Sequence, residues 1–370
     1  MITKFSVSNF KGFQSEFTLT LKDANGYTFN QECIRNGIVN TALIYGHNGV
    51  GKSNLGIALF DIISHLTENN TIESEYNFYL NAYNKAKTAT FSYEFLIDST
   101  VVTYEYEKED KDTIISESFS IGGELIAHID RNKEDTATFN LKGTENLNRK
   151  VANKGLSILK YIKNNSVLEE DFANTIFLYF FDFIEGMLFF RSLEKNAYIG
   201  LEIGRTVVLE DIIEKDNIKD FEEFLNKAGV ACTLTVVEKF DKNALAFEFN
   251  ETTIPFENSA SQGTRALTIF YFWLQKVKEE NKVSFLFIDE FDAFYHHELS
   301  ALIVEELKKT GIQFILTTHN TSIITNDLLR PDCYFLMNKE NIRSLAKSAS
   351  KELREAHNIE KMYRANTFHV

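Results

Sequence analysis

Short apolar runs alternate with segments of helical spacing at both ends of the chain, and together they predict a parallel sheet flanked by helices. Three runs have the length and continuous apolar character of buried strands: residues 38–45, 283–288 and 314–318. Apolar residues recur at helical spacing in three neighbouring segments: residues 55–66, 266–277 and 299–308. Strands that alternate with helices form sheets whose faces those helices cover, so the pattern predicts an α/β core.

Alternation of apolar and polar positions dominates other parts of the chain and predicts antiparallel strands. The alternating segments are residues 2–7, 17–21, 88–97, 101–107 and 114–121, followed later by 232–237 and 244–249. The charged run at residues 107–112 is typical of a hairpin tip between two of them. We therefore expect an antiparallel β lobe after the first strand–helix unit of the core.

The middle of the chain, residues 146–224, shows helical spacing of mixed amphipathicity. Its most apolar window, residues 176–190, contains Asp182 and Glu185 and is too short to span a bilayer. The window predicts a buried helix, and a surface that faces a partner is the alternative. The expected organisation is an N-terminal lobe with an antiparallel β subdomain, a helical insertion and a C-terminal lobe, at residues 1–145, 146–230 and 231–370.

Composition and charge limit the class of protein. The chain has 370 residues, 44% of them hydrophobic and 25% charged, which are values of a globular protein with a sizeable core. Its net charge of −14 provides no overall electrostatic attraction for nucleic acid. Cys33, Cys232 and Cys333 are scattered and fit reduced thiols better than disulfides or a zinc site. With no signal peptide or membrane span expected, we assign the protein to the cytoplasm.

Two segments of opposite charge lie in the middle of the chain. Residues 142–163 contain six Lys or Arg against one acidic residue, whereas residues 202–223 contain eight Asp or Glu against three basic ones. Both fit solvated helical faces. The alternative is that the first segment, the basic strip, contacts nucleic acid or a partner protein.

The sequence Gly46-His47-Asn48-Gly49-Val50-Gly51-Lys52-Ser53 lies between the first apolar run and the first helical segment. It has the pattern G-x-x-x-x-G-K-S in a strand–loop–helix context, which identifies a phosphate-binding P-loop. Glycines let the main chain coil around an anion, and the following helix directs its positive end at the phosphates. We expect Lys52 to reach the β- and γ-phosphates and the Ser53 hydroxyl to bind Mg²⁺. The alternative is a glycine-rich turn with an unrelated lysine.

Acidic and imidazole side chains follow the two later apolar runs. Asp289 and Glu290 end the first of these runs, at the edge where open α/β sheets bind ligands. Asp289 is a candidate for holding Mg²⁺ through water, and Glu290 for orienting and deprotonating an attacking water. His319 follows the next run, so it should emerge beside Glu290 and contact the γ-phosphate. Solvated strand-end acids and a structural histidine are the alternatives.

A second helix start has the chemistry of an anion site. Residues 258–265 read Asn-Ser-Ala-Ser-Gln-Gly-Thr-Arg directly before the apolar helix at 266–277. Ser261 and Gly263 could bind a phosphate there, most sensibly on the nucleotide of a second subunit. A plain helix N-cap is the alternative.

These four pieces resemble the ABC-type ATPase heads of the structural-maintenance-of-chromosomes (SMC), RecF and overcoming-lysogenization-defect group. Residues 46–53 match the Walker A motif, 285–290 the Walker B motif, 261–264 the signature motif and His319 the switch histidine. The opening KFSVSNFKGF also resembles the first strand of that group, whose turn lies near the nucleotide, and this implies a role for Lys11.

The resemblance implies a P-loop NTPase with ABC-ATPase head architecture, built of a mixed sheet core, an antiparallel β lobe and an inserted helical subdomain. It implies ATP and Mg²⁺ as cofactors, slow ATP hydrolysis, and a homodimer, or a higher oligomer, that encloses ATP between subunits. The implied nucleotide contacts are Gly46, Asn48, Gly49, Gly51, Lys52, Ser53 and Lys11, with Ser261 and Gly263 from the second subunit. The implied metal ligands are Ser53 and Asp289, and the implied catalytic residues are Glu290, His319 and Lys52.

Residues 287–296, 314–320 and 358–363 are similar to the small AAA-family ATP-binding proteins of bacterial anti-phage and abortive-infection operons. That likeness implies a sensor or scaffold for a separately encoded effector, either a nuclease or a toxin. Two other functions stay open: a RecF- or SMC-like ATPase that repairs or recombines DNA, and a scaffold that ATP stabilises with negligible turnover.

One departure from the group concerns the metal site. No glutamine lies between Ser53 and Gln262, so the usual Q-loop ligand is missing. The sequence leaves open which residue stands in its place. The signature Ser-Gln-Gly-Thr also differs from Leu-Ser-Gly-Gly-Gln and fits the RecF-like branch better than transporters.

Overall fold

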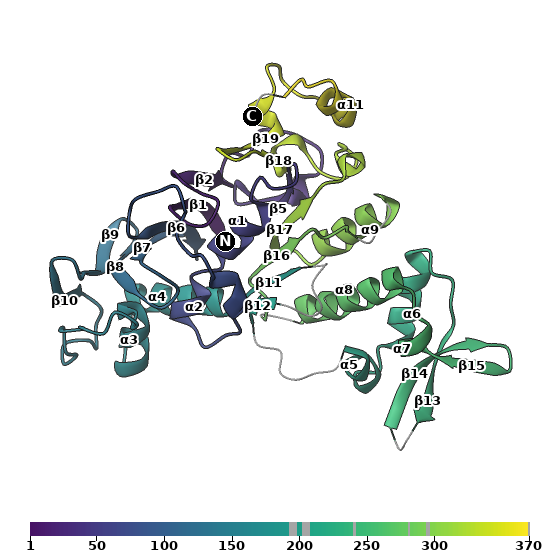
Figure 1. Ribbon diagram of the computed structural model, residues 1–370, viewed down its shortest axis with the longest axis horizontal. Coiled ribbons are helices and arrows are strands. Elements are labelled where there is room, and N and C mark those ends of the chain that lie inside the picture. Colours follow the sequence, from purple (N-terminus) through teal and green to yellow (C-terminus); the bar gives the residue numbers. More distant parts are fainter. Residues whose placement is uncertain (192–197, 202–207, 240–241, 280–281, 294–296, 369–370) are drawn as a thin grey trace.

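The structure is a computed structural model, and it describes residues 1–191, 198–201, 208–239, 242–279, 282–293 and 297–368 (Figure 1). Residues 202–207 of the acidic segment and residues 294–296 of the family-like stretch 287–296 lie outside this described part. Two seven-stranded sheets form the body of the molecule, and a smaller three-stranded sheet projects from it.

The core sheet confirms the predicted α/β architecture. Its strand order is β12-β11-β16-β17-β5-β18-β19, and the five inner strands are parallel. The strands are β5 (Thr41–Tyr45), β11 (Met187–Arg191), β12 (Tyr198–Gly200), β16 (Phe285–Asp289), β17 (Gln313–Thr318), β18 (Tyr334–Met337) and β19 (Ile342–Ser344). Every residue of β5, β16 and β17 is buried, which agrees with their continuous apolar sequences.

Helix α1 (Lys52–Leu59) lies between the two large sheets. A Cβ on Gly56 would lie 2.6 Å from the ring of Phe189 and 2.8 Å from the ring of Phe287, so only glycine permits this close approach to the core sheet. On its other side the hydroxyl of Tyr93 donates a hydrogen bond to the Ala58 carbonyl at 3.0 Å. The helix predicted at 55–66 is therefore wrong in length, because α1 ends at Leu59 and a short α2 (Ile63–Leu66) follows.

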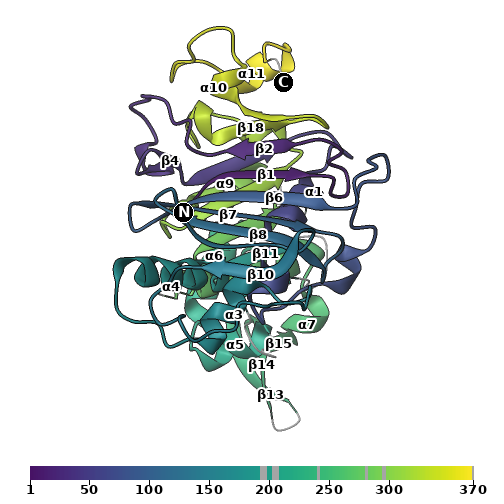
Figure 2. The same cartoon turned by 90° about the vertical axis from the view of Figure 1, so that its left-hand side faces the viewer.

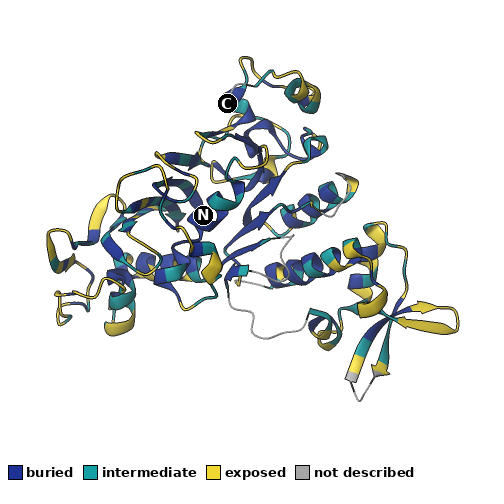
Figure 3. Cartoon of the chain, in the orientation of Figure 1, coloured by how far each residue is buried: buried dark blue, intermediate teal, exposed yellow. Residues whose placement is uncertain are grey.

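Helices α8 (Gln262–Lys278) and α9 (His297–Lys308) cover the opposite face of the core sheet (Figure 1). Trp273 of α8 stacks on Phe190 of β11, with ring centroids 5.2 Å apart. Both helices lie where the apolar spacing predicted them. Buried residues follow the two large sheets and the helices beside them (Figure 3).

The second large sheet is antiparallel and has the order β10-β9-β8-β7-β6-β1-β2 (Figure 2). Its strands are β1 (Ile2–Ser8), β2 (Phe17–Thr20), β6 (Ala89–Ile97), β7 (Thr100–Lys108), β8 (Ile114–Ile121), β9 (Glu124–Asp130) and β10 (Glu134–Phe139). Alternate residues are buried along β6, as the sequence predicted. The first two strands of the chain belong to this sheet, and β9 and β10 were not predicted.

The apolar window 176–190, expected to be one buried helix, is divided in the structure. Helix α4 (Phe172–Glu185) ends at its C-cap Gly186, and the rest of the window is β11, a strand of the core sheet. A Cβ on Gly186 would lie 2.9 Å from the Lys282 carbonyl oxygen, which explains glycine at this junction. The buried helix is thus confirmed for the first part of the window and wrong for the second.

Other parts of the range 146–230 pack on different neighbours. Helices α3 (Ile158–Asn165) and α4 pack on the antiparallel sheet, whereas α5 (Val208–Glu214) and α6 (Ile218–Lys227) pack on α8 and on the small sheet. The small sheet comprises β13 (Leu234–Lys239), β14 (Lys242–Phe249) and β15 (Thr252–Pro255), and α7 (Phe256–Ser259) leads from it into α8. The three-domain division at residues 145 and 230 stays a prediction.

The remaining elements are short. They are β3 (Ile34–Arg35), β4 (Ile38–Val39), α10 (Leu345–Ser348), α11 (Ile359–Arg364) and the 3₁₀ turns η1 (Gln31–Cys33), η2 (Glu73–Tyr76), η3 (Thr321–Ile323) and η4 (Pro331–Cys333). Among the described residues, no helix is both long and apolar enough to cross a bilayer.

Candidate active site

The loop between β5 and α1 has the geometry of a phosphate cradle. Gly49 and Gly51 have φ angles of +76° and +106°, in the left-handed region that favours glycine. A Cβ on Gly46 would lie 2.7 Å from the Met337 carbonyl oxygen, so that position also requires glycine. Gly51 is the N-cap of α1 and provides no capping side chain, which leaves the N–H groups of the first turn to bind an anion. Asn48 is exposed on this loop.

Lys52 is the first residue of α1 and is buried under the loop. Its ammonium group donates hydrogen bonds to the Gly46 carbonyl at 2.8 Å and to Nε2 of His319 at 2.9 Å. Burial lowers the pKa of Lys52, while the nearby carboxylates Asp289 and Glu290 act in the opposite direction. These acids keep a positive charge favourable at this point, where the γ-phosphate of a nucleotide would lie.

Asp289 and Glu290 stand at the carboxyl end of β16, next to β17. Asp289 is 2% exposed, and its Oδ1 accepts a hydrogen bond from the Thr317 hydroxyl at 2.7 Å. The same hydroxyl accepts the Glu290 N–H at 2.8 Å. Glu290 has φ +48°, a conformation that costs a non-glycine residue about 1–3 kcal/mol. Thr317 thus holds both the Asp289 carboxylate and the Glu290 backbone at the end of β16.

His319 lies between the lysine and the glutamate. Its Nε2 is 2.9 Å from Nζ of Lys52 and 3.5 Å from Oε1 of Glu290. The parallel order β16-β17-β5 therefore brings together Lys52, Asp289, Glu290 and His319 from three strand ends. The sequence predicted this convergence from the P-loop pattern and from the strand-end positions of Asp289, Glu290 and His319.

Arg191 is a residue of this site that the sequence did not reveal. It ends β11 and pairs in register with Asp289 of β16. Its Nε lies 3.3 Å from Oδ2 of Asp289, and its Nη1 lies 2.8 Å from Oε1 of Glu75. The signal was present, because Arg191 directly follows an apolar run, but that run was interpreted as the end of a helix.

Asp292 is a second residue that the sequence did not single out. Its Oδ2 accepts a hydrogen bond from the Thr318 hydroxyl at 2.6 Å, directly before His319. Burial raises the pKa of Asp292, and its bond with Thr318 acts in the opposite direction. This bond ties the loop after β16 to the end of β17 and so helps to hold His319 in place.

The residues expected to bind Mg²⁺ fit that ion only together with a nucleotide. Ser53 makes no side-chain hydrogen bond within the described part of the chain, so its hydroxyl is available as a ligand. No group of three His, Cys, Asp or Glu side chains suited to a metal occurs among the described residues. Mg²⁺ is commonly bound by one or two protein oxygens together with nucleotide phosphates and water. One hydroxyl and one carboxylate, from Ser53 and Asp289, fit this pattern.

Lys11 lies at the edge of a hollow beside the P-loop. Its Nζ donates a hydrogen bond to the Asn77 carbonyl at 3.0 Å. Burial lowers the pKa of Lys11, and Glu75 acts against this shift. The hollow is lined by residues 11–15, 49–51 and 81–83 together with Phe17, Asn54, Lys339 and Glu340. It adjoins the glycine loop and has a volume of about 630 Å³, which is room for the sugar and base of a nucleotide.

Ser261 and Gly263 are not brought to the P-loop of their own chain. Ser261 is the N-cap of α8, and its hydroxyl oxygen accepts the Thr264 N–H at 3.1 Å. The side chain of Arg265 donates to the Ala260 carbonyl at 3.1 Å and so holds this corner together. The preceding α7 packs on the small sheet (β13–β15), far from α1 (Figure 1). Ser261 is exposed, as a contact with a second molecule requires.

Three of the six basic side chains in the strip at 142–163 pair with acids of the same chain. Lys142 lies 3.5 Å from Asp171, Lys160 lies 2.5 Å from Glu68, and Lys163 pairs with Glu185. Arg149 stacks on the ring of Phe139 at 4.4 Å. These pairs reduce the positive charge that the strip offers to phosphate groups, while Lys150 and Lys154 stay exposed.

Comparison with known proteins gives one family match. A family model described as "AAA domain, putative AbiEii toxin, Type IV TA system" matches residues 42–325. This range includes the P-loop at 46–53 and residues 261–264, 289–290 and 319. No curated protein matches the chain.

Similar solved structures include SMC head domains. The head domain from Thermotoga maritima is 14% identical and covers 93% of this chain and 98% of its own, with a TM-score of 0.44. An SMC head bound to the C-winged helix domain of ScpA is 17% identical, with coverage of 93% and 96% and a TM-score of 0.47. The Pyrococcus furiosus head with an extended coiled coil, bound to the C-terminal domain of ScpA, is 14% identical, with coverage of 98% and 99% and a TM-score of 0.46.

Proposed function

The chain belongs to this AAA domain family, and from that premise we propose that it is a Mg–ATP-dependent ABC-type ATPase that closes as a head-to-head homodimer. One observation carries the proposal. Lys52, Asp289, Glu290 and His319 converge at the carboxyl ends of three adjacent parallel strands, beside a glycine loop that opens onto a free helix N-terminus. That combination binds a triphosphate and acts on its terminal phosphate.

Catalysis in this site rests on placement and on charge. The N–H groups of the loop and Lys52 hold the β- and γ-phosphates, and His319 contacts the γ-phosphate from the neighbouring strand. Glu290, whose carboxylate lies 3.5 Å from His319, orients the attacking water and accepts its proton. Ser53 and Asp289 would hold Mg²⁺, which when bound would supply positive charge to offset that of the phosphate oxygens.

The second half of each site comes from the partner subunit in this proposal. Ser261 and Gly263 lie at the start of α8, where Ser261 is exposed, and neither lies beside the P-loop within the described part of its own chain. Two copies related by a twofold axis would each place this corner over the other's P-loop, so that two nucleotides lie at the interface. Closure would therefore require ATP.

Sedimentation velocity tests the dimer. Glu290→Gln removes the general base but keeps the shape of the site, so ATP should bind and persist, and the variant should sediment as a dimer with Mg–ATP and as a monomer without it. A variant that binds ATP but stays monomeric would contradict the proposal. Lys52→Ala is the matched control, and titration calorimetry should show much weaker ATP binding for it; unchanged binding would refute the role of the P-loop.

The biological role that we propose is control of a separately encoded effector, a nuclease or toxin, in cytoplasmic anti-phage defence. The family description, which contains the words "putative AbiEii toxin, Type IV TA system", links the family to toxin–antitoxin systems and names no separate effector. Phage plating on cells that express the chain with its neighbouring gene tests it: protection should require Lys52 and be altered by Glu290→Gln. Equal plating with and without the chain would contradict it.

Repair or recombination of DNA is one alternative that the sequence left open. Ion pairs between three lysines of the basic strip and nearby acids make this alternative less favourable. Salt-dependent DNA binding that is lost on neutralising Lys150 and Lys154, which are exposed in that strip, would favour it. The other alternative, an ATP-stabilised scaffold, is separated from the ATPase by measured turnover.

A further inference from the structure

Arg191 connects two acids that belong to different parts of the molecule. Asp289 ends β16 in the core sheet, whereas Glu75 lies in η2, the turn before β6 of the antiparallel sheet. The guanidinium contacts both, at 3.3 Å through Nε and at 2.8 Å through Nη1. The Arg191 side chain is 19% exposed, and that of Asp289 is 2% exposed. An ion pair this far removed from water is only weakly screened.

The contact with Asp289 occupies the oxygen that faces away from Thr317. Oδ1 of Asp289 accepts the Thr317 hydroxyl, and Oδ2 faces the Arg191 guanidinium. Both oxygens of this carboxylate therefore have partners within the chain. A carboxylate buried to this degree is costly unless a cation or hydrogen-bond donors compensate it.

Arginine at this strand end cannot act as a metal ligand. A guanidinium has five N–H donors, no acceptor and a permanent positive charge. A glutamine at the same place would offer an oxygen to a metal, whereas arginine adds a like charge beside the metal position. Mg²⁺ and Arg191 thus have the same attractor, Asp289, and repel each other.

We propose that Arg191 is a positioning residue that competes with Mg²⁺ for Asp289, so that loading of the metal displaces the guanidinium from Asp289 while Glu75 retains it. This inference rests on the proposed ATPase function and specifies how its metal site is regulated. It assigns the missing Q-loop position to a residue that opposes the metal instead of binding it.

Displacement of Arg191 from Asp289 would also affect the hollow beside the P-loop, through Glu75 and Lys11. Glu75 lies in η2, and two residues later the Asn77 carbonyl accepts a hydrogen bond from Lys11, which lines the hollow beside the P-loop. A guanidinium that leaves Asp289 pairs more closely with Glu75 and so changes the charge that faces Lys11. Metal loading is thereby linked to the segment that borders the nucleotide.

Equilibrium binding of a fluorescent, non-hydrolysable nucleotide, mant-AMP-PNP, tests the inference in Mg²⁺ and in EDTA. The readout is the ratio of the Kd in EDTA to the Kd in Mg²⁺. Arg191→Ala should raise this ratio at least about tenfold, because Mg²⁺ no longer competes and the uncovered Asp289 repels metal-free nucleotide. A merely structural role would change both Kd values together and leave the ratio unmoved.

Two further variants keep the test decisive if Arg191→Ala folds poorly. Glu75→Gln releases Arg191 toward Asp289, so it should lower the ratio by about threefold, the opposite direction from Arg191→Ala. Arg191→Lys keeps the charge and should stay close to the wild-type ratio. Lys22→Ala, which removes a lysine from an exposed pair with Glu94 on the antiparallel sheet, is the matched control and should change nothing.

The outcomes separate this inference from the proposed function. If the wild-type chain binds mant-AMP-PNP no better than Lys52→Ala does, the proposed function fails. If the wild-type chain binds it tightly and Arg191→Ala leaves the ratio unchanged or lowers it, the ATPase assignment stands and the competition by Arg191 is refuted. A ratio that moves in the same direction for Arg191→Ala and Glu75→Gln would also refute it.

Discussion

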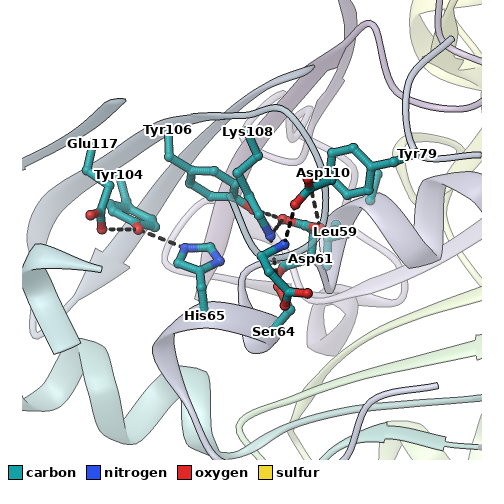
Figure 4. A network of polar contacts seen from close by, with 12 residues as sticks. Leu59, Asp61, Ser64, His65, Tyr79, Tyr104, Tyr106, Lys108, Asp110 and Glu117 are labelled. Carbon is teal, nitrogen blue, oxygen red and sulfur yellow. Dashed lines mark hydrogen bonds and ion pairs between the residues drawn. The ribbon is translucent and has the colours of Figure 1, made fainter. Parts of the chain in front are cut away.

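Replacing Lys108 with methionine removes the positive member of a fully buried ion pair where α1 meets the antiparallel sheet (Figure 4). Asp61 follows α1, and Lys108 ends β7; both side chains are 0% exposed, and Nζ lies 3.0 Å from Oδ2. The hydroxyls of Tyr79 and Tyr106 donate to the same carboxylate at 2.9 and 3.0 Å. The network fixes the far end of the helix whose first turn forms the phosphate site.

The size of the effect follows from this geometry. At an effective dielectric constant of about 20, unit charges 3.0 Å apart attract each other by about 5–6 kcal/mol. Burial lowers the pKa of Lys108 although Asp61 attracts it, which shows that desolvation cancels much of that attraction. The pair therefore adds little net stability, but Asp61 left alone is a buried charge with only two tyrosine donors. We expect Lys108→Met to lower the free energy of unfolding by about 3–5 kcal/mol.

Urea unfolding followed by circular dichroism measures this loss. The double variant Asp61→Asn, Lys108→Met should recover most of the stability, because it removes both charges and retains an acceptor for the tyrosines. Lys22→Met, which breaks an exposed pair with Glu94, is the control and should cost less than about 1 kcal/mol. If Lys108→Met loses no more free energy of unfolding than the control, Asp61 without Lys108 is not a costly buried charge. A double variant as unstable as Lys108→Met alone would lead to the same conclusion.

Two further predictions concern α1 and the short helix α2 that follows it. Gly56→Ala should lower the free energy of unfolding by about 1–3 kcal/mol, because its Cβ would meet the rings of Phe189 and Phe287; a stabilised variant in urea unfolding would show that α1 can move. Burial holds the pKa of His65 well below its usual 6.5. Below pH 6.5 the unfolded chain therefore binds a proton at this histidine that the folded chain does not bind. The free energy of unfolding then falls by up to about 1.4 kcal/mol for each pH unit. His65→Gln should therefore lose less stability than the wild type between pH 7.5 and 5.5, and equal losses in urea midpoints would contradict this.

The strand ends of the site could be predicted because each follows a continuous apolar run. The runs before Lys52, Asp289 and His319 are buried on both faces, and parallel strands place their carboxyl ends at one edge. These side chains could be expected to lie close together without knowing which strands are neighbours in the sheet. The left-handed backbone of Glu290 and its bond to Thr317, however, depend on tertiary contacts that no pattern along the chain contains.

Arg191 and β11 escaped prediction for a different reason. Residues 176–190 are apolar almost throughout, and periodicity cannot divide such a run into a helix and a strand. Gly186 was the available signal, because it is the C-cap at which α4 ends and the chain turns into the core sheet. With that division made, Arg191 would have fallen at the same edge as Asp289. The pairing of Arg191 with Glu75 would still have required the structure.

Sedimentation velocity of a double variant tests the central claim, a nucleotide shared by two chains, most directly. Ser261→Arg in the Glu290→Gln background places a bulky cation on the exposed start of α8, far from the P-loop of its own chain. We expect the double variant to bind Mg–ATP as tightly as Glu290→Gln does and yet to sediment as a monomer. A dimer that forms as readily with Ser261→Arg as without it would contradict the shared site.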